Sequence, residues 1–340
     1  MSTDPTPSVA FRPPQERPDV HIVVLNWNGW KQTIACLESI KQQDYTPLST
    51  IVVDNGSEDG SWDKLAAWQR SADRSPAESG DRSAQVQLLR STSNLGFAQG
   101  CNFGIAKAIS LGARYVLLLN NDARLGRSAV SCLVKVAIRW KAGIVGATLM
   151  DNHGRISRGT PKWPLRLFWN ARTDSNIGRQ GDSREVAEAS GAAMLIDEAL
   201  LESRIRAVGY ALDPTFFMYG EDTDLCVYAR AHQWRVIVAR DAVVKHAGGG
   251  SSNGPGSCRS YYYITRNRVF LANRWLGLGQ RVLFHIYYIP SRFALIGIRA
   301  IAKRPNCARA VLSGLFDAYR SVRGQWVHHG QWVPRDNRTV

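Results

Sequence analysis

The chain has 340 residues, of which 44% are hydrophobic and 21% are charged, so it can bury one large or two modest cores. Its 43 lysines and arginines against 28 acidic residues give a formal net charge of +15. The six cysteines are scattered without a C-x-x-C pair, which argues against a disulfide framework or a zinc ribbon and favours a reducing cytoplasm. Residues 1–18 are rich in proline and lack an apolar run, so we expect a disordered tail rather than a signal peptide.

Residues 19–150 alternate short apolar runs with helical patterns. The runs rich in Val, Ile and Leu predict strands at 20–25, 50–53, 86–89, 115–119 and 144–149. Helices are predicted to end near residue 43, to follow residue 60, to span 97–110 and to begin near residue 126. Unbroken apolar strands, each followed by a helix, are typical of a parallel sheet covered on both faces. With right-handed crossovers, this half is predicted to be doubly wound and of a nucleotide-binding type.

Residues 151–260 have a different pattern and are treated as a second half. The polar stretch 151–190 predicts loops and short strands. Helices are expected at 197–206 and 222–232, and two short β-runs at 235–238 and 242–245. Long helical patterns then dominate, so residues 261–340 are predicted to form a basic, aromatic helical extension.

Positive charge is concentrated in this helical extension. It holds 13 lysines and arginines but only 2 acidic residues, a net charge of +11, so the first 260 residues carry +4. Aromatic residues interleaved with arginines favour contact with an anionic membrane surface, such as the cytoplasmic leaflet. The alternative is that these aromatics pack on the rest of the protein as a helical cap. No membrane span is expected, because the apolar stretch 282–302 is interrupted by a histidine, a proline and two arginines.

Polar residues follow the first four predicted strands. They are Asn26, Asp54, Asn94 and the run Asn120-Asn121-Asp122. Each alone is a common turn or capping residue, but the carboxyl ends of parallel strands meet at one edge of the sheet, where ligands bind. Asp122 could hold a divalent cation that neutralises a diphosphate, with His246 as a second ligand. The alternatives are that Asp122 caps the next helix and that His246 only makes hydrogen bonds.

The densest acidic cluster contains Glu221, Asp222 and Asp224 and follows an aromatic run. The helical spacing of the next apolar residues places Asp222 at or near a helix N-terminus. One interpretation is a helix cap with a favourable dipole interaction. The other is a general base, Asp222, supported by its two acidic neighbours.

Seven ordered segments resemble the motifs of inverting glycosyltransferase family 2, and they are most similar to its rhamnosyltransferase-like members. In chain order they are VVLNWNG, IVVDNGSEDGS, NLGFAQGCNFGI, LLLNNDA, SGAAMLI, FFMYGEDTDLCVYAR and VKHAGGGSS. The resemblance covers roughly residues 20–275. It implies an α/β protein of GT-A fold, with a doubly wound, mostly parallel sheet and a C-terminal helical extension. Residues 19–150 would form the nucleotide-sugar-binding half, and residues 151–260 the acceptor and catalytic half.

The resemblance also implies a role for each matched residue. Nucleotide-sugar binding is carried over to Asn26, Asp54, Asn94, Gly96, Asn120, Asn121 and Arg266, with Tyr263 and Asn267 beside the last in a motif that closes over the donor. Asp122 would be the chelating acid of the family's D-x-D motif, whose first aspartate is replaced here by Asn120. His246 would be the other protein ligand of a Mg²⁺ or Mn²⁺ ion.

The same resemblance places the reacting groups. Ser190, Gly191 and Ala192 match the acceptor-side segment. Asp222 matches the catalytic base, with Glu221 and Asp224 as supports. The base would take a proton from an acceptor hydroxyl, and the reaction would invert the configuration of the transferred sugar.

The implied function is transfer of a sugar, rhamnose first, from a dTDP- or UDP-sugar to a hydroxyl of a glycan or lipid-linked acceptor in cell-surface polysaccharide synthesis. The enzyme would be cytoplasmic and peripheral on the inner face of the plasma membrane. A UDP-hexose or galactofuranosyl donor is an alternative. Outside enzymes, a basic nucleic-acid-binding protein is the competing hypothesis, but no recognised binding motif is present. A catalytically silent sugar-nucleotide binder is disfavoured by the presence of Asp122, Asp222 and His246.

Overall fold

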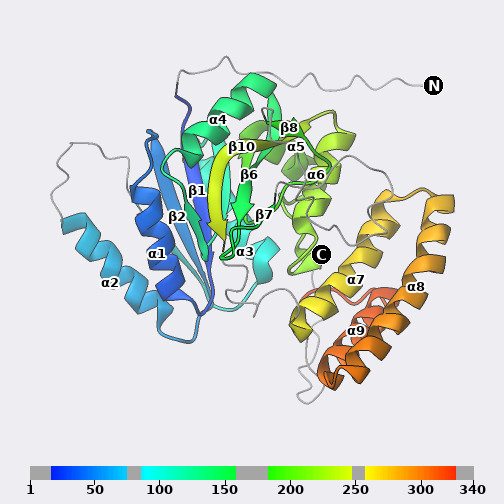
Figure 1. Ribbon diagram of the computed structural model, residues 1–340. Helices are drawn as coiled ribbons and strands as arrows, with labels where there is room; N and C mark the ends of the chain where they lie inside the picture. The colour runs from blue at the N-terminus through cyan, green and yellow to red at the C-terminus, as the bar shows by residue number, and fades with distance from the viewer. Residues whose placement is uncertain (1–16, 75–85, 158–182, 247–256, 327–340) are drawn as a thin grey trace.

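The computed structural model describes residues 17–74, 86–157, 183–246 and 257–326. In these ranges the chain forms one large mixed sheet with helices on both faces and a group of helices beside it (Figure 1). Most of the expected disordered tail, and the middle of the polar stretch 151–190, lie outside the described residues.

The strands of the sheet are ordered β3-β2-β1-β4-β9-β6-β10-β5, and two short strands, β7 and β8, pair with β6 and β10. Their bounds are β1 Val20–Asn26, β2 Leu48–Asn55, β3 Val86–Ser91, β4 Tyr115–Asn120, β5 Ala123–Leu125, β6 Ala142–Met150, β7 Ile156–Ser157, β8 Arg184–Glu185, β9 Ala193–Asp197 and β10 Arg235–His246. The neighbours β3, β2, β1 and β4 run parallel, as do β6 and β10. The predicted mostly parallel sheet is therefore confirmed.

Helices cover both faces of the sheet, which is why whole strands are apolar. Adjacent residues such as Val23 and Val24 of β1 are both buried. Side chains of α1 and α4 pack in one core, and those of α3, α5 and α6 pack in the other. The bounds are α1 Trp30–Lys41, α2 Ser61–Arg74, α3 Gly96–Ser110, α4 Ala129–Trp140, α5 Glu198–Val208 and α6 Glu221–Ala231.

Three features of the sheet differ from the sequence-based expectation. Strand β9 was not predicted; it inserts antiparallel between β4 and β6. The two short runs at 235–238 and 242–245 form the single strand β10, with an irregularity between Ala239 and Val243 in its pairing with β6. The three-residue strand β5 lies directly after Asp122, where a turn into the next helix was expected, and pairs antiparallel with the end of β10.

The helical extension consists of α7 Cys258–Trp275, α8 Leu278–Ile301 and α9 Pro305–Tyr319. These helices pack mainly on one another and stand beside the sheet on the side of α6 (Figure 1). A disulfide between Cys258 and Cys307 joins the first turns of α7 and α9, so the inference from scattered cysteines missed one bonded pair. Within the described residues, no helix is both long and apolar enough to cross a bilayer.

Candidate active site

The first part of the site is a buried pair of polar residues where β1 and β2 end. Asn26 and Asp54 are in register across these strands, and both are almost completely buried. The Asn26 Nδ2 donates to Asp54 Oδ1 at 2.8 Å, and Ser57 Oγ donates to the same oxygen at 2.5 Å. Thr33 Oγ1 donates to Asn26 Oδ1 at 2.7 Å, so the asparagine is fixed from both sides. Asp54 Oδ2 is buried without a hydrogen-bond partner, and it is thus an acceptor available to a ligand.

Arg90 is a residue of this region that motif reasoning missed. It lies on β3 in register with Asp54, and its Nε is 3.9 Å from Asp54 Oδ2. Its guanidinium also lies over the Trp62 ring, 5.3 Å from the centroid. The side chain is half exposed, so its donors can reach a ligand beside the carboxylate. The signal that could have found it is register, because parallel pairing aligns the ends of neighbouring strands.

Hydrogen bonds to Asn94 Oδ1 and to the carbonyl of Gly96 stabilise this edge. Asn55 Nδ2 donates to Asn94 Oδ1 and to the carbonyl of Gly96, both at 3.1 Å. Gly96 has a φ of +82°, and a Cβ there would lie 2.6 Å from the carbonyl oxygen of Phe217. The glycine therefore lets the segment before α6 approach the start of α3, where Phe97 N donates to the same carbonyl at 2.6 Å.

The candidate metal site forms where β4 and β10 end. The pairing of β5 with β10 sets Ala123 opposite His246, and this brings the histidine to the run that follows β4. His246 Nε2 is 3.1 Å from Asp122 Oδ1 and 3.3 Å from Asn120 Nδ2. Asn120 Oδ1 is buried without a hydrogen-bond partner. Asn121 instead donates to Thr33 Oγ1 at 3.1 Å and so ties this run to the Asn26 network.

These donors fit a hard or borderline divalent cation. A carboxylate, an imidazole and an amide oxygen are ligands that Mn²⁺ accepts, and oxygen donors suit Mg²⁺. Among the described residues, no group of three or more His, Cys, Asp and Glu side chains could hold a metal ion. A cation held by so few protein ligands would leave its other coordination positions to water or to a diphosphate.

The segment Ser190-Gly191-Ala192, predicted to lie on the acceptor side, connects the candidate metal site to Asp222, the predicted base. Asn120 N donates to the carbonyl of Ala192 at 2.9 Å. One residue earlier, Gly191 N donates to Asp222 Oδ2 at 3.0 Å, and a Cβ on Gly191 would lie 3.3 Å from Asp222 Cβ. Asp222 Oδ1 accepts from Thr223 N at 2.8 Å. These two hydrogen bonds fix the half-buried Asp222 carboxylate beside residues 190–192, which lie between it and the candidate metal site.

Comparisons with known proteins identify the family and the fold of the chain. The family model described as glycosyl transferase family 2 matches residues 19–204, more than half of the chain. The chain belongs to glycosyl transferase family 2. The match ends before Asp222 and His246 and therefore does not include them.

Among curated relatives, N-acetylglucosaminyl-diphospho-decaprenol L-rhamnosyltransferase of Mycobacterium tuberculosis is 26% identical, with 71% of this chain and 80% of that protein matched. The low-salt glycan biosynthesis hexosyltransferase Agl10 of Haloferax volcanii is 23% identical, with 62% of each chain matched.

Solved structures show that the fold is GT-A. Residues 1–349 of TarS from S. aureus, in complex with UDP-GlcNAc, have a TM-score of 0.58 at 15% identity, covering 89% of this chain and 81% of that one. A mannosyltransferase from Pyrobaculum calidifontis, in complex with GDP-Man and Mn²⁺, also has a TM-score of 0.58 at 15% identity, covering 94% and 91%. This chain spans 43% of the longer TarS chain.

The surroundings of Asp224 indicate a structural role, whereas a supporting catalytic role was expected for it. It is completely buried and forms ion pairs with Arg204 and with Arg274, whose Nη1 is 2.9 Å from Asp224 Oδ1. Trp275 Nε1 donates to the same oxygen at 2.8 Å. Asp224 therefore joins α6 to α5 and α7, and it faces away from Asp222.

Arg266 is also placed differently from its expected role in nucleotide-sugar binding. Its side chain is fully buried, and it donates to the carbonyls of Gly324 at 2.7 Å and Phe216 at 2.9 Å. The next residue, Asn267, uses its Nδ2 to contact the carbonyls of Phe216, Met218 and Tyr219 at 3.0, 2.8 and 2.6 Å. The two side chains hold the segment that leads into α6. A buried arginine gives no sequence signal of its burial, because arginines are usually exposed.

The segment that Arg266 and Asn267 contact, residues 216–220, has unusual backbone angles. Phe217 and Tyr219 have φ values of 63° and 66°, and Gly220, the residue before α6, has a φ of 107°. Left-handed φ in non-glycine residues costs on the order of 1–3 kcal/mol each and persists where surrounding contacts fix it. The contacts from α7 and from Phe97 supply that constraint at residues 216–219, shortly before Glu221 and Asp222.

Glu221 is buried beside Asp222, and one of its carboxylate oxygens has no hydrogen-bond partner. Burial, and then the charge of Asp222, raise the pKa of Glu221 well above its usual range. A raised pKa means that the folded state holds this proton more tightly than the unfolded state does. The free energy of unfolding therefore falls as pH rises above about 4.3, the ordinary glutamate pKa. We expect Glu221 to be protonated in the folded protein, where it lies next to Asp222.

The Glu221→Gln variant tests this expectation. It should be more stable than the unmodified protein at mildly alkaline pH, and the difference should shrink as the pH falls toward about 4.3. Urea unfolding across this pH range measures the effect. Glu58→Gln, at an exposed position, is the matched control and should give a flat difference. A Glu221→Gln difference that is equally flat would show that Glu221 is ionised in the folded state.

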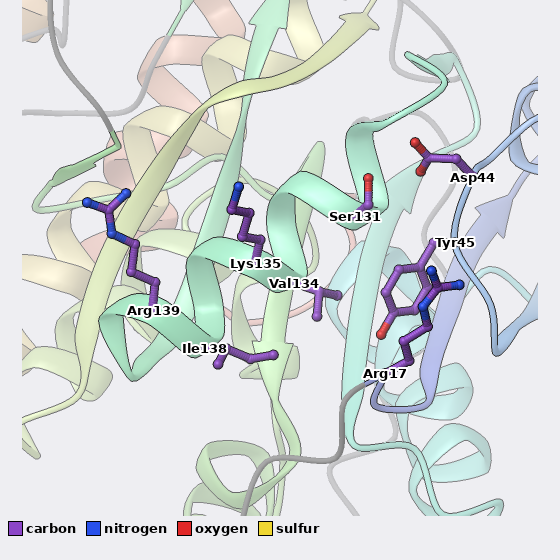
Figure 2. Close-up of a pocket in the computed structure, with 8 residues that line it drawn as sticks. All are labelled: Arg17, Asp44, Tyr45, Ser131, Val134, Lys135, Ile138 and Arg139. Carbon is purple, nitrogen blue, oxygen red and sulfur yellow. The ribbon is translucent and has the colours of Figure 1, made fainter.

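A cavity of about 420 Å³ lies away from this site, near the amino ends of β1 and β2 (Figure 2). It is lined by Arg17, Asp44, Tyr45, Ser131, Val134, Lys135, Ile138 and Arg139. Arg17 precedes β1 and Tyr45 precedes β2, so the cavity is at the end of these strands opposite Asn26 and Asp54. None of the predicted site residues lines it.

Proposed function

We propose that this family 2 protein is an inverting glycosyltransferase that moves L-rhamnose from a dTDP- or UDP-sugar to a hydroxyl of a lipid-linked glycan, in cell-surface polysaccharide synthesis. The observation that carries the proposal is the continuous arrangement from Asp222, through Gly191 and Ala192, to Asn120 and the Asp122–His246 pair. In this proposal, the base lies on one side of that backbone segment and the candidate cation site lies on the other. The named specificity of the mycobacterial relative supports the choice of rhamnose and of a lipid-linked acceptor.

We infer that the donor's nucleotide binds at Asn26, Asp54 and Arg90. The unpartnered Asp54 Oδ2 can accept from the N3–H of uracil or thymine, and the adjacent Arg90 can donate to a base carbonyl. Cytosine has no N3–H, and it could donate to the carboxylate only through its N4 amino group. This complementarity supports a dTDP- or UDP-sugar, with a UDP-hexose as the runner-up donor.

Asp122, His246 and Asn120 would hold Mg²⁺ or Mn²⁺ against the diphosphate. When bound, the cation would stabilise the charge of the departing nucleotide. Asp222 takes the proton of the acceptor hydroxyl as its oxygen attacks the anomeric carbon from the face opposite the nucleotide. The backbone N–H groups of Gly191 and Thr223 orient this carboxylate, and the single displacement inverts the sugar.

The donor is tested by thermal shift with dTDP-, UDP- and GDP-sugars, each with and without Mg²⁺ or Mn²⁺. We expect dTDP-L-rhamnose to raise the melting temperature most and the cation to enlarge the shift. Stabilisation by a purine nucleotide sugar alone would overturn the base assignment. A second step measures rhamnose transfer to a prenyl-diphosphate-linked N-acetylglucosamine.

The cation site gives a separate prediction. Asp122→Ala and His246→Ala should each remove most of the cation-dependent part of the thermal shift, because each deletes one of the few protein ligands. Exposed residues of the same types, Asp241→Ala and His153→Ala, are the matched controls and should retain it. Unchanged cation dependence in both site variants would place the metal elsewhere.

A further inference from the structure

Helix α8 has an extended apolar face that no other described part of the chain covers. Of its 24 residues only Phe284 and Tyr288 are buried, yet most of the others are apolar. The exposed side chains include Leu278, Val282, Ile286, Phe293, Ile298 and Ile301, which are 50–84% accessible. We refer to these six residues as the α8 face.

The α8 face is continuous along the helix. At about 100° per residue, its members fall within an arc of about 200°, opposite the line of Phe284 and Tyr288. A helix of this length is about 36 Å long, so the face is a long stripe rather than a local patch. Exposed apolar areas of this size mark interaction sites in soluble proteins.

The charges around the α8 face indicate which kind of partner it fits. Residues 278–326 contain eight lysines and arginines and one acidic residue, Asp317. Asp317 accepts a hydrogen bond from Tyr262 of α7 at 2.6 Å and is thus engaged with the protein. Arg281, Arg292 and Arg299 are partly exposed and lie within about 20° of one another on the helix, between the apolar arc and the buried line. The guanidinium of Arg292 lies over the Tyr288 ring and that of Arg299 over the Tyr261 ring, both at 4.8 Å. Cations along the flank of an apolar face are complementary to anionic headgroups above an acyl layer.

A second copy of the chain fits this face less well. A symmetric dimer through α8 would bring the same arginine-rich flanks of both copies together, with no acidic residue of α8 to pair with them. In Figure 1, α7 lies between the sheet and α8. Its neighbours among the helices are α9 and, less extensively, α7.

We propose that the α8 face docks the enzyme flat on an anionic lipid bilayer, with its apolar side chains at the boundary between headgroups and acyl chains. The helix lies in the plane of the surface and does not cross it. Docking does not depend on catalysis, but its use rests on the proposed function, because a lipid-linked acceptor is presented at such a surface. The helical group also reaches the site edge, where Arg259 of α7 lies over the Trp27 ring at 5.2 Å.

Vesicle co-sedimentation of the full-length protein tests the proposal. The protein should sediment with phosphatidylcholine vesicles that contain phosphatidylglycerol, and not with pure phosphatidylcholine, and high salt should weaken binding. The double variant Val282→Glu/Phe293→Glu should weaken vesicle binding on the order of a hundredfold, since it removes two apolar side chains that the bilayer would bury. The matched control is Phe103→Glu/Val208→Glu, which adds the same charge at exposed positions on α3 and α5 and should bind as before.

Three outcomes would overturn the proposal: no sedimentation with either vesicle, equal loss of binding in both double variants, or a dimer in sedimentation velocity that only Val282→Glu/Phe293→Glu dissociates. The melting temperature without added donor, measured on the same samples, checks that both variants are folded. Because the vesicles contain no sugar nucleotide, docking can succeed while the donor assignment fails, and the reverse. The two failures are therefore distinguishable.

Discussion

Replacing Asp222 with asparagine should lower turnover by about 10²–10⁴-fold, the usual contribution of a general base. Asparagine keeps an oxygen that can accept from Gly191 N or Thr223 N, so the fold of this region and donor binding should be nearly unchanged. The measurement is steady-state sugar transfer together with the donor-induced thermal shift. The matched control, Asp241→Asn at an exposed position of β10, should keep full activity.

Two results would contradict this role. Near-normal turnover in Asp222→Asn would reduce Asp222 to the helix-capping residue that the sequence also allows. A loss of donor binding equal to the loss of turnover would show that the carboxylate acts in donor binding rather than on the acceptor hydroxyl.

Replacing Asp224 with alanine should have the opposite profile and destabilise the protein by about 3–5 kcal/mol. The substitution leaves the guanidinium of Arg204 buried without its anionic partner and removes one partner from Arg274. Urea unfolding measures this loss. Asp222→Ala, two residues away on the same helix, is the matched control and should change stability far less. Equal unfolding midpoints would mean that the buried ion pairs contribute nothing net.

The contrast between Asp222 and Asp224 was accessible from the sequence in principle. Residues two apart on a helix point about 200° away from each other, so both carboxylates could not face the same substrate. The sequence could not show whether Asp222 or Asp224 faces the site, because that depends on where α5 and α7 lie. Arg204 and Arg274, which identify Asp224 as structural, are 20 and 50 residues away along the chain.

The edge of the sheet that carries the site was well predicted because strand direction is nearly fixed by the strand–helix alternation. Asn26, Asp54 and Asp122 do lie at carboxyl ends of parallel strands or just beyond them. Strand β9 was missed because a five-residue apolar run has no periodicity that reports its direction or its central position. The Cys258–Cys307 bond was missed because a separation of 49 residues carries no spacing signal.

The hydrogen bonds from Arg266 and Asn267 to the segment before α6 limit how chimaeras between relatives can be built. Acceptor preference is an attractive target for chimaeras, and the helical extension looks like a detachable module when judged by its composition. A graft that replaced α7–α9 alone would remove the groups that fix Phe217 and Tyr219 in left-handed conformations, and Asp222 would lose its alignment with Gly191. The transferable unit in this family 2 fold therefore includes residues 213–224 together with α7–α9, although more than thirty residues separate them in the sequence.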